Sequence, residues 1–240
     1  MDMHKIDVAA VAERLSEPFL MEQIARVDHF GVYLYLCEGF VPRHHHMSRD
    51  EMFYVYKGLF SVQVYQGLGT ANAGQRYLNL SDDELTVIPR GLAHETGSLI
   101  RTICFNLQAQ SDPERKNGHS RLTVDDIAEL PKWSISREAE RLGEPCLPIH
   151  LAQVDEMSLR LVECEGTTAW HRHPHHDEML FVREGALGIS TEAGQIELAP
   201  DELYVIPRDQ IHRLSATQPT LVVSLIHGEV SIPAHMGLEK

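Results

Sequence analysis

The amino-acid sequence repeats itself, and this internal duplication limits the chain to folds that can be built twice. Residues 12–58 align without a gap with residues 139–185, at an offset of 127. A second block, 81–95, matches 199–213 at an offset of 118, so nine residues are lost between the blocks. They fall in the glycine-rich segment YQGLGTANAGQRY, which predicts a longer hairpin loop in the first copy. We therefore predict two domains of like fold.

Each copy reads as a series of short β-strands. Five segments of the first copy are rich in β-branched and aromatic residues and are bounded by Gly, Pro or Asp, which is typical of strands. These segments are VYLYLCEG, EMFYVYKG, FSVQVYQ, ELTVIP and IRTICFNLQ. Many short strands in about 100 residues predict an all-β fold, namely a duplicated antiparallel β-barrel or jelly roll.

The repeat also sets the expected domain boundaries. We predict an N-terminal barrel with a leading helix over residues 1–110 and a C-terminal barrel over residues 139–240. Residues 111–138 have little counterpart in the repeat and are expected to form a linker with a short helix. Thr123 is the expected N-cap of that helix, and Pro131 is expected to end it. Helical periodicity is otherwise seen only near the two AERL segments.

Three consecutive histidines in VPRHHHMSRDEMFYVYKG fit either a metal site or a solvated polar loop. The duplication favours the metal site, because three histidines and one glutamate recur in both copies, whereas His45 meets Arg172. The recurring residues, which we predict to be metal ligands, are His44, His46, Glu51 and His94 in the first copy and His171, His173, Glu178 and His212 in the second.

The spacing of these residues fits inward-facing ligands. Residues two apart on a strand share a face, so His44 and His46 are expected to point inward and His45 outward. Imidazole and carboxylate suit Fe, Mn, Ni, Co, Cu or Zn without distinguishing them, and we expect about one divalent transition metal per domain. His175 and His176 offer a second ligand pattern, but the repeat register places them outside the ligand set.

The motifs resemble those of the cupin superfamily. The first copy reads Gly39-x4-His44-x-His46-x4-Glu51-x6-Gly58, then Asp83-x5-Pro89-x-Gly91-x2-His94, and the second copy has the same order. This resemblance covers most of both repeats and implies a bicupin, in which each small barrel holds one metal through these His and Glu side chains.

Three positions depart from the family pattern. Asp83 and Asp201 stand where the family commonly has Gly, and Asp209 stands where the first copy keeps Gly91. Asp tolerates turn conformations that most other residues resist, so we expect the turns to survive. None of these positions is a predicted ligand.

The residues around the predicted ligands differ between the copies. The first copy has Tyr33 and Tyr35 where the second has Arg160 and Val162, so we expect two differently lined pockets. Apolar residues that share strand parity with the glutamates are expected to line the pockets or to pack in the core. They are Phe53, Val55, Leu180 and Val182. The arginines that follow the repeated prolines, Arg90 and Arg208, are expected either to be plain surface residues or to steer anions.

Composition limits the partners. The net charge of −14 argues against nucleic acid, because phosphate binding requires a basic face. There is no apolar stretch long enough to span a bilayer and no CxxC pair among the four cysteines. We expect a cytoplasmic protein with reduced thiols and no membrane partner. We also expect a homodimer, because jelly-roll sheets often pair across a two-fold axis.

The function expected from these features is that of a mononuclear-metal oxygenase of the dioxygenase type, which acts on a small organic substrate in the barrel. Glu51 and Glu178 are the predicted catalytic residues, because a carboxylate beside a metal can also move a proton. The alternatives are a metal-dependent isomerase or lyase acting on a sugar or keto acid, and a non-catalytic protein that binds a small ligand.

Overall fold

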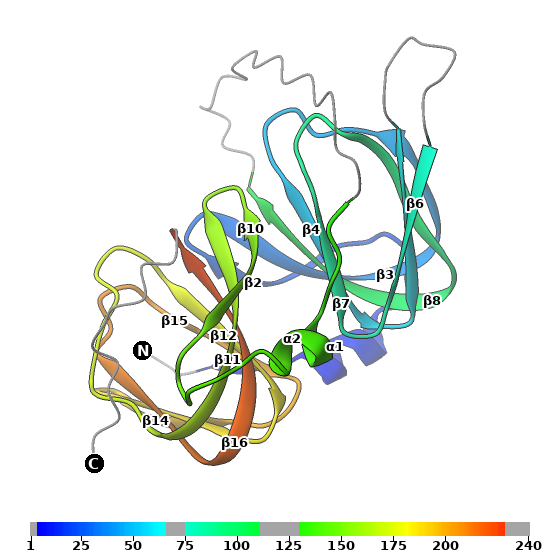
Figure 1. Cartoon of the computed structure of the whole chain (residues 1–240). Helices are drawn as coiled ribbons and strands as arrows, with labels where there is room; N and C mark the ends of the chain where they lie inside the picture. Colours follow the sequence, from blue (N-terminus) through cyan, green and yellow to red (C-terminus); the bar gives the residue numbers. More distant parts are fainter. Residues whose placement is uncertain (1–3, 66–74, 111–129, 229–240) are drawn as a thin grey trace. The chain divides into compact units, whose positions relative to one another are not determined.

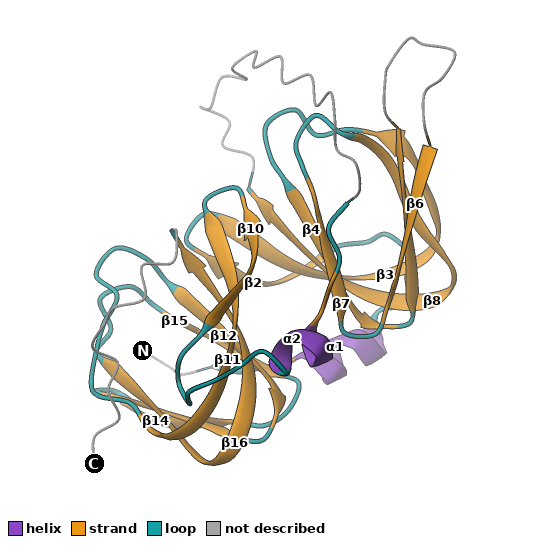
Figure 2. Ribbon diagram, in the orientation of Figure 1, coloured by secondary structure: helices purple, strands orange, loops and turns teal. Residues whose placement is uncertain are grey.

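The computed structural model of the chain describes residues 4–65, 75–110 and 130–228. Within these residues the chain forms two antiparallel β-sheets, each curled around an apolar core, and two short helices (Figures 1 and 2). The helices are α1 (Val8–Arg14) and α2 (Ile135–Ala139). The predicted all-β fold, a duplicated antiparallel β-barrel, is therefore confirmed.

The chain divides into two compact units, which we call the C-terminal and the N-terminal barrel. The C-terminal barrel comprises Met1–Glu13, Ala25–Asp28 and Ile135–Lys240, and the N-terminal barrel comprises Arg14–Ile24 and His29–Ser134. The leading segment of the chain thus contacts the C-terminal barrel. The domain boundaries that we predicted from the repeat remain a prediction.

The N-terminal barrel contains the strands of the first copy and one short strand that follows the linker. Its sheet has the order β2-β3-β8-β4-β7-β9, and β5 pairs with both β6 and β8. The strands are β2 (Glu22–Val27), β3 (Phe30–His44), β4 (Glu51–Lys57), β5 (Leu59–Tyr65), β6 (Gln75–Ser81), β7 (Glu84–Ile88), β8 (Ala93–Ala109) and β9 (Trp133–Ser134).

The C-terminal barrel repeats this arrangement with the second copy. Its sheet has the order β1-β15-β12-β16-β11-β10, and β13 pairs with both β14 and β16. The strands are β1 (Ile6–Asp7), β10 (Ile149–Val154), β11 (Met157–Thr167), β12 (Glu178–Glu184), β13 (Leu187–Thr191), β14 (Gly194–Leu198), β15 (Glu202–Ile206) and β16 (His212–His227).

One long strand in each barrel closes the sheet on itself. The first part of β8 pairs with β5, its second part pairs with β4, and β3 lies along its other edge. In the same way, β16 pairs with β13 near its start and with β12 near its end. A strand that changes partner along its length turns a flat sheet into a barrel. The sequence predicted only the second part of β8, because most of the β-branched and aromatic residues of this strand lie there.

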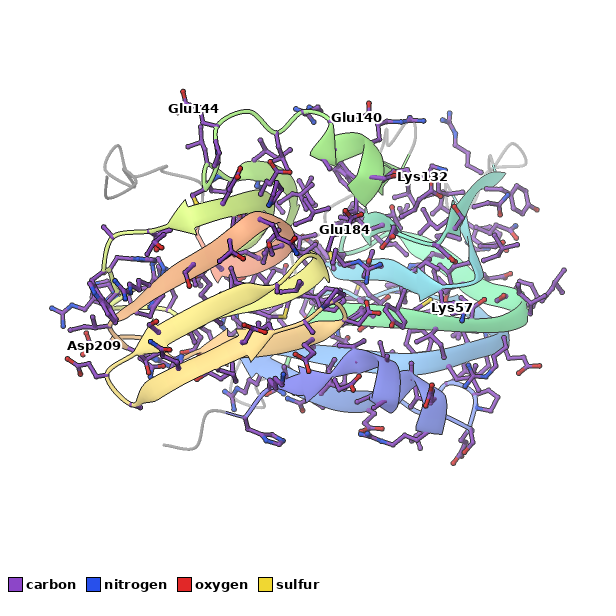
Figure 3. The ribbon with its side chains drawn as sticks, turned by 90° about the horizontal axis from the view of Figure 1, so that it is seen from below. Lys57, Lys132, Glu140, Glu144, Glu184 and Asp209 are labelled. Atoms are coloured by element: carbon purple, nitrogen blue, oxygen red, sulfur yellow. The ribbon has the colours of Figure 1, made fainter. Side chains whose placement is uncertain are left out.

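Both barrels bury the same strand positions. Val55 and Val182 are fully buried at equivalent places in β4 and β12, and each lies within its barrel's core cluster. Lys57 and Glu184 end these two strands with opposite charges at equivalent positions (Figure 3). The duplication therefore preserves the core and allows the exposed charge to change.

The aspartates that replace family glycines do adopt backbone conformations that favour glycine. The φ angles are 63° at Asp83, 66° at Asp201 and 64° at Asp209, and Gly91 has 82°. A short polar side chain can be accommodated in this left-handed region at modest cost. The expectation that these turns survive the substitutions is confirmed.

The helices agree in part with the sequence. Helix α1 includes residues 12–14 of the first AERL segment, but α2 ends at Ala139, and two turns follow there instead. The predicted linker helix at Thr123 lies outside the described residues. Neither α1 nor α2 is long and apolar enough to cross a membrane.

We predict that Gly185→Ala destabilises the protein, whereas Gly143→Ala does not. Gly185 has a φ of +84°, and an added Cβ would lie 2.9 Å from the Thr220 Cα; nothing lies within 4 Å of a Cβ at Gly143. Strain of this kind costs about 1–3 kcal/mol. Urea unfolding followed by circular dichroism measures the difference. Equal unfolding midpoints for the two variants would contradict the assignment of strain to Gly185.

Candidate metal centres

In the N-terminal barrel, the four predicted ligands lie together. His44 ends β3 and pairs across the sheet with His94 of β8, and Glu51 is the first residue of β4. His46 lies two residues beyond the end of β3. The ligand atoms of the four residues lie within 4.8 Å of one another.

In the C-terminal barrel, the second set forms the same cluster. His171 and His212 exchange two backbone hydrogen bonds of 2.9 Å each, and Glu178 is the first residue of β12. His173 follows in the loop. The ligand atoms of this set also lie within 4.8 Å of one another. Two equivalent clusters therefore occur at equivalent places in the duplicated fold.

The strand-parity argument led to residues that do cluster in the fold, but by an incomplete route. The strand β3 ends at His44, so His46 faces the cluster from a loop and not from the same strand face. His45 is exposed, as expected. In the second copy, His175 is exposed and His176 stacks on His173 at a centroid distance of 5.0 Å, and neither belongs to the cluster.

Backbone carbonyl groups fix the orientation of four of the six histidines. In each case the ring Nδ1 lies within hydrogen-bond distance of the carbonyl oxygen two residues earlier, so Nδ1 carries the hydrogen and Nε2 carries a free lone pair. The pairs are His44 with Pro42 (2.9 Å), His94 with Leu92 (2.8 Å), His171 with Ala169 (2.9 Å) and His212 with Gln210 (2.9 Å).

The Nε2 atoms meet the glutamate carboxylates. Glu51 Oε2 lies 3.2 Å from His46 Nε2 and 3.4 Å from His94 Nε2. The corresponding distances from Glu178 Oε2 are 3.2 Å to His173 Nε2 and 3.7 Å to His212 Nε2. Among the described residues, these six buried atoms have no hydrogen-bond partner.

Such a cluster requires a positive charge. Lone pairs and a carboxylate that face one another at these distances repel unless a proton or a cation lies between them, and buried polar groups without partners are rare. Three imidazole nitrogens and one carboxylate oxygen are a donor set that divalent transition metals bind. The residues present therefore fit a metal ion, and each barrel can hold one.

The pKa shifts favour the ligand forms of the side chains. Burial alone would raise the pKa of the Glu51 carboxyl group, but the close imidazole groups of His46 and His94 outweigh burial and hold the pKa well below its usual range. Burial lowers the pKa of His44 and of His171, with a smaller contribution from neighbouring imidazoles. Both directions favour an ionised carboxylate and neutral imidazoles.

The second oxygen of each glutamate is held by a residue that the sequence argument missed. Asn106 Nδ2 donates to Glu51 Oε1 at 2.9 Å, and Ser224 Oγ donates to Glu178 Oε1 at 3.1 Å. These residues are equivalent at the offset of 118. A polar residue inside the apolar runs ICFNLQ and VVSLIH was the signal that could have found them.

A cavity adjoins the C-terminal cluster. It combines three ligands with an arginine, thiols and apolar walls, and its lining is Cys146, Pro148, Arg160, Val162, Cys164, Thr168, His171, His173, Glu178, Leu180, Leu214 and Ser224. Leu180 both lines the cavity and packs in the core, so it has both of the roles expected for it, while Val182 packs in the core.

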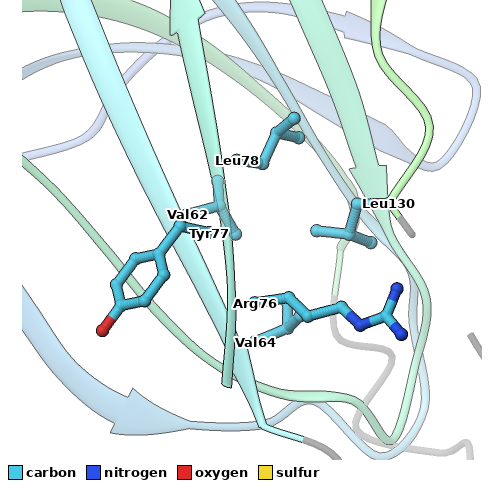
Figure 4. Close-up of a pocket in the computed structure, with 6 residues that line it drawn as sticks. All are labelled: Val62, Val64, Arg76, Tyr77, Leu78 and Leu130. Carbon is cyan, nitrogen blue, oxygen red and sulfur yellow. The ribbon is translucent and has the colours of Figure 1, made fainter. Parts of the chain in front are cut away.

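The N-terminal barrel is lined differently. Tyr35 is buried, with its ring centroid 6.4 Å from that of Phe53, and both residues belong with Val55 to the apolar core. A separate hollow lies along β5 and β6 (Figure 4). Its lining residues are Val62, Val64, Arg76, Tyr77, Leu78 and Leu130. The expected contrast between the two interiors is present.

The repeated arginines after the prolines are tied to aspartates. The backbone N–H groups of Arg90 and Arg208 donate to the Asp50 and Asp177 carboxylates, each at 2.9 Å. Each aspartate directly precedes a ligand glutamate in the sequence. These contacts connect the loop before β4 or β12 to the loop that follows the proline, so the two arginine positions have a structural role.

Paired antiparallel barrels, each with a cluster of three histidines and one glutamate, define the class of duplicated β-barrel proteins with candidate metal centres. Residues 159–231 match the family described as Cupin domain. This match lies within the C-terminal repeat, and both units have the cupin barrel fold. The resemblance to a bicupin that the sequence indicated is confirmed.

Known proteins support this fold assignment. The uncharacterized protein YdbB of Bacillus subtilis (strain 168) is 27% identical over 90 residues, which cover 37% of this chain and 80% of that protein. A cupin 2 conserved barrel domain protein from Leptotrichia buccalis has a TM-score of 0.66 at 10% identity, with 95% of this chain and 98% of that chain covered.

Two enzymes of known structure share the fold at low identity. A salicylate 1,2-dioxygenase from Pseudoaminobacter salicylatoxidans, in complex with gentisate, has a TM-score of 0.68 at 11% identity, and the match covers 94% of this chain and 82% of that chain. The Bacillus subtilis oxalate decarboxylase, studied for its Mn(II) centres, has a TM-score of 0.56 at 13% identity, with 95% and 78% covered. At these identities, the likeness shows the fold alone.

We predict that Glu51→Gln and Glu178→Gln each remove about one metal equivalent per chain, because each change removes the single anionic ligand of one cluster. Plasma emission spectrometry of metal-loaded protein measures the equivalents. His45→Ala and His175→Ala are the matched controls, since both side chains are exposed and outside the clusters. Full occupancy in both glutamate variants would show that the ligand set is wrong.

We also predict that Asn106→Ala weakens metal binding at the N-terminal centre by about 10- to 100-fold, because it removes the group that orients Glu51. Competition with a chelator measures the affinity. Asn79→Ala is the control, because Asn79 accepts a hydrogen bond from Ser61 and is no part of the cluster. An unchanged affinity in Asn106→Ala would mean that the amide does not support the ligand.

Proposed function

We propose that this chain is a metal-dependent enzyme of the oxygenase type, with one divalent transition metal in each barrel and a small organic substrate bound beside it. The observation that carries the proposal is the convergence of Nε2 and Oε2 atoms without hydrogen-bond partners in two buried clusters. In the C-terminal barrel, this cluster also forms part of a cavity wall.

The eight predicted ligands would hold the metals: His44, His46, Glu51 and His94 in one barrel, and His171, His173, Glu178 and His212 in the other. When bound, such a metal supplies Lewis acidity, and four protein ligands leave positions open for substrate or dioxygen. The carbonyl contacts of the histidines keep their Nε2 atoms aimed at the centre, so little reorganisation is needed.

The glutamates have a second role in this proposal. Glu51 and Glu178 each present Oε2 to the cluster and Oε1 to a hydrogen-bond donor, so each carboxylate is held in one orientation. When Oε2 is not bound to the metal, a carboxylate held in this way would accept a proton from a substrate hydroxyl group at that atom. Leu180 and Leu214, which line the C-terminal cavity, restrict access of water to that proton.

Other expectations from the sequence stay predictions. They are a cytoplasmic location, a homodimer and the absence of a nucleic-acid partner. The net charge of −14 supports the last of these. They concern the location of the protein, its oligomeric state and its partners, and they do not affect the arrangement of the predicted ligands.

We predict that the protein, when loaded with a redox-active divalent metal, consumes dioxygen together with at least one substrate from a panel of diols, diketones, thiols and catechols. An oxygen electrode and mass spectrometry of products measure the uptake and its stoichiometry. The Glu51→Gln/Glu178→Gln double variant is expected to lose the activity, and His45→Ala to keep it. Product formation under argon without oxygen uptake would overturn the oxygenase proposal in favour of an isomerase or lyase.

A further inference from the structure

Arg160 is the one cationic side chain among the residues that line the cavity of the C-terminal barrel. It lies in β11, directly opposite Ser224 of β16, the residue that donates to Glu178 Oε1. Arg160, Glu178 and the predicted ligands His171 and His173 therefore line the same cavity. The repeat predicted a cationic residue at this position of the second pocket, but it did not indicate which group the arginine binds.

The guanidinium group of Arg160 lacks a full set of protein partners. Its Nε atom is buried and has no hydrogen-bond partner among the described residues. Burial lowers the pKa of Arg160 and the charge of Glu178 raises it, but an arginine stays protonated in proteins. A half-buried cation without a matching anion is costly, and the fork of N–H donors fits a carboxylate in a two-point contact.

The nearby charges do not neutralise Arg160. Glu178 is the anion of the cluster, and its Oε2 faces His173 and His212 while Oε1 accepts from Ser224. A divalent cation at the cluster would retain positive charge after binding this single carboxylate. The cavity therefore has two positive features and only one fixed negative group, which favours an anionic ligand.

The N-terminal barrel offers a natural comparison. The residue equivalent to Arg160 is Tyr33, which carries no positive charge. A Cβ added at Gly31 would lie 2.3 Å from the Tyr33 ring, so this ring lies against the backbone of its own strand. The equivalent of Ser224 is Asn106, which holds Glu51. The two centres thus share their ligands and differ in the charge beside them.

We propose that the C-terminal barrel binds a small organic carboxylate, whose carboxylate group pairs with the Arg160 guanidinium while a second oxygen faces the His and Glu cluster. The apolar walls at Val162, Leu180 and Leu214 fit a short hydrocarbon body. The N-terminal barrel, with Tyr33 at this position, does not share the preference. This inference rests on the proposed metal-dependent function and names the substrate class of one of its two sites.

The test compares two ligands of similar size, glycolate and ethylene glycol, by isothermal titration calorimetry of the full-length, metal-loaded protein. Both offer a hydroxyl group, but only glycolate carries a carboxylate. Wild-type protein is expected to bind glycolate at least about tenfold more tightly than ethylene glycol. Equal affinity for the two ligands in the wild-type protein would overturn the proposal without any variant.

Variants of Arg160 test whether this side chain causes the preference for glycolate. Arg160→Gln is expected to weaken glycolate binding by about 10- to 100-fold and to leave ethylene glycol binding unchanged, and Arg160→Lys is expected to restore part of the loss. Arg172→Gln is the matched control, because Arg172 is an exposed arginine that pairs with Asp209. Glycolate binding that is unaffected by Arg160→Gln would refute the role of Arg160.

Metal analysis of the same samples separates this inference from the proposed function. Arg160→Gln is expected to retain about two metal equivalents per chain, because Arg160 is not a ligand. Wild-type protein that binds no metal would refute the proposed function as a whole. Two bound metals together with no preference for glycolate would refute only the carboxylate assignment.

Discussion

The structure depends on one electrostatic constraint, which is that four electron-pair donors point at one another inside each barrel. The lone pairs of three imidazoles and one carboxylate meet at distances where they repel unless a positive charge lies between them. Hydrogen bonds from the Nδ1 atoms of two histidines in each cluster to carbonyl oxygens, and from Asn106 or Ser224 to the glutamate, hold the donors in place against this repulsion. The barrel holds the four side chains close together, and the cluster that they form is the candidate metal centre.

The sequence revealed the clusters because duplication served as an internal comparison. His44 and His46 recur while His45 does not, and this difference singled out the two histidines that the fold brings into the cluster. The strands near the ligands were also predictable, because β4 and β12 are short, continuous runs of apolar residues that are each followed by a glycine. The longest strand was predicted only in part, since the first part of β8 carries polar residues.

Features that depend on contacts distant in sequence were not predictable. The pairing of β1 with β15 joins residue 6 to residue 203, and neither short segment has a pattern that indicates a partner. Asn106 looked like one polar residue in an apolar strand, and only the fold shows that its amide reaches Glu51. The end of β3 at His44 was missed for a related reason. Strand parity predicts the face of a residue but not the position at which a strand stops.

The long strands β8 and β16 also explain where this protein could change its length during evolution. Each carries a ligand histidine near its start and the residue that holds the glutamate twelve positions later, His94 with Asn106 and His212 with Ser224. An insertion between them would shift one group against the other and reverse the face on which it lies. The two copies do differ in length, but between β5 and β6 in one and between β13 and β14 in the other, and no described residue of either connection belongs to a cluster. The difference in length thus lies outside the segments that separate each histidine from the residue that holds the glutamate.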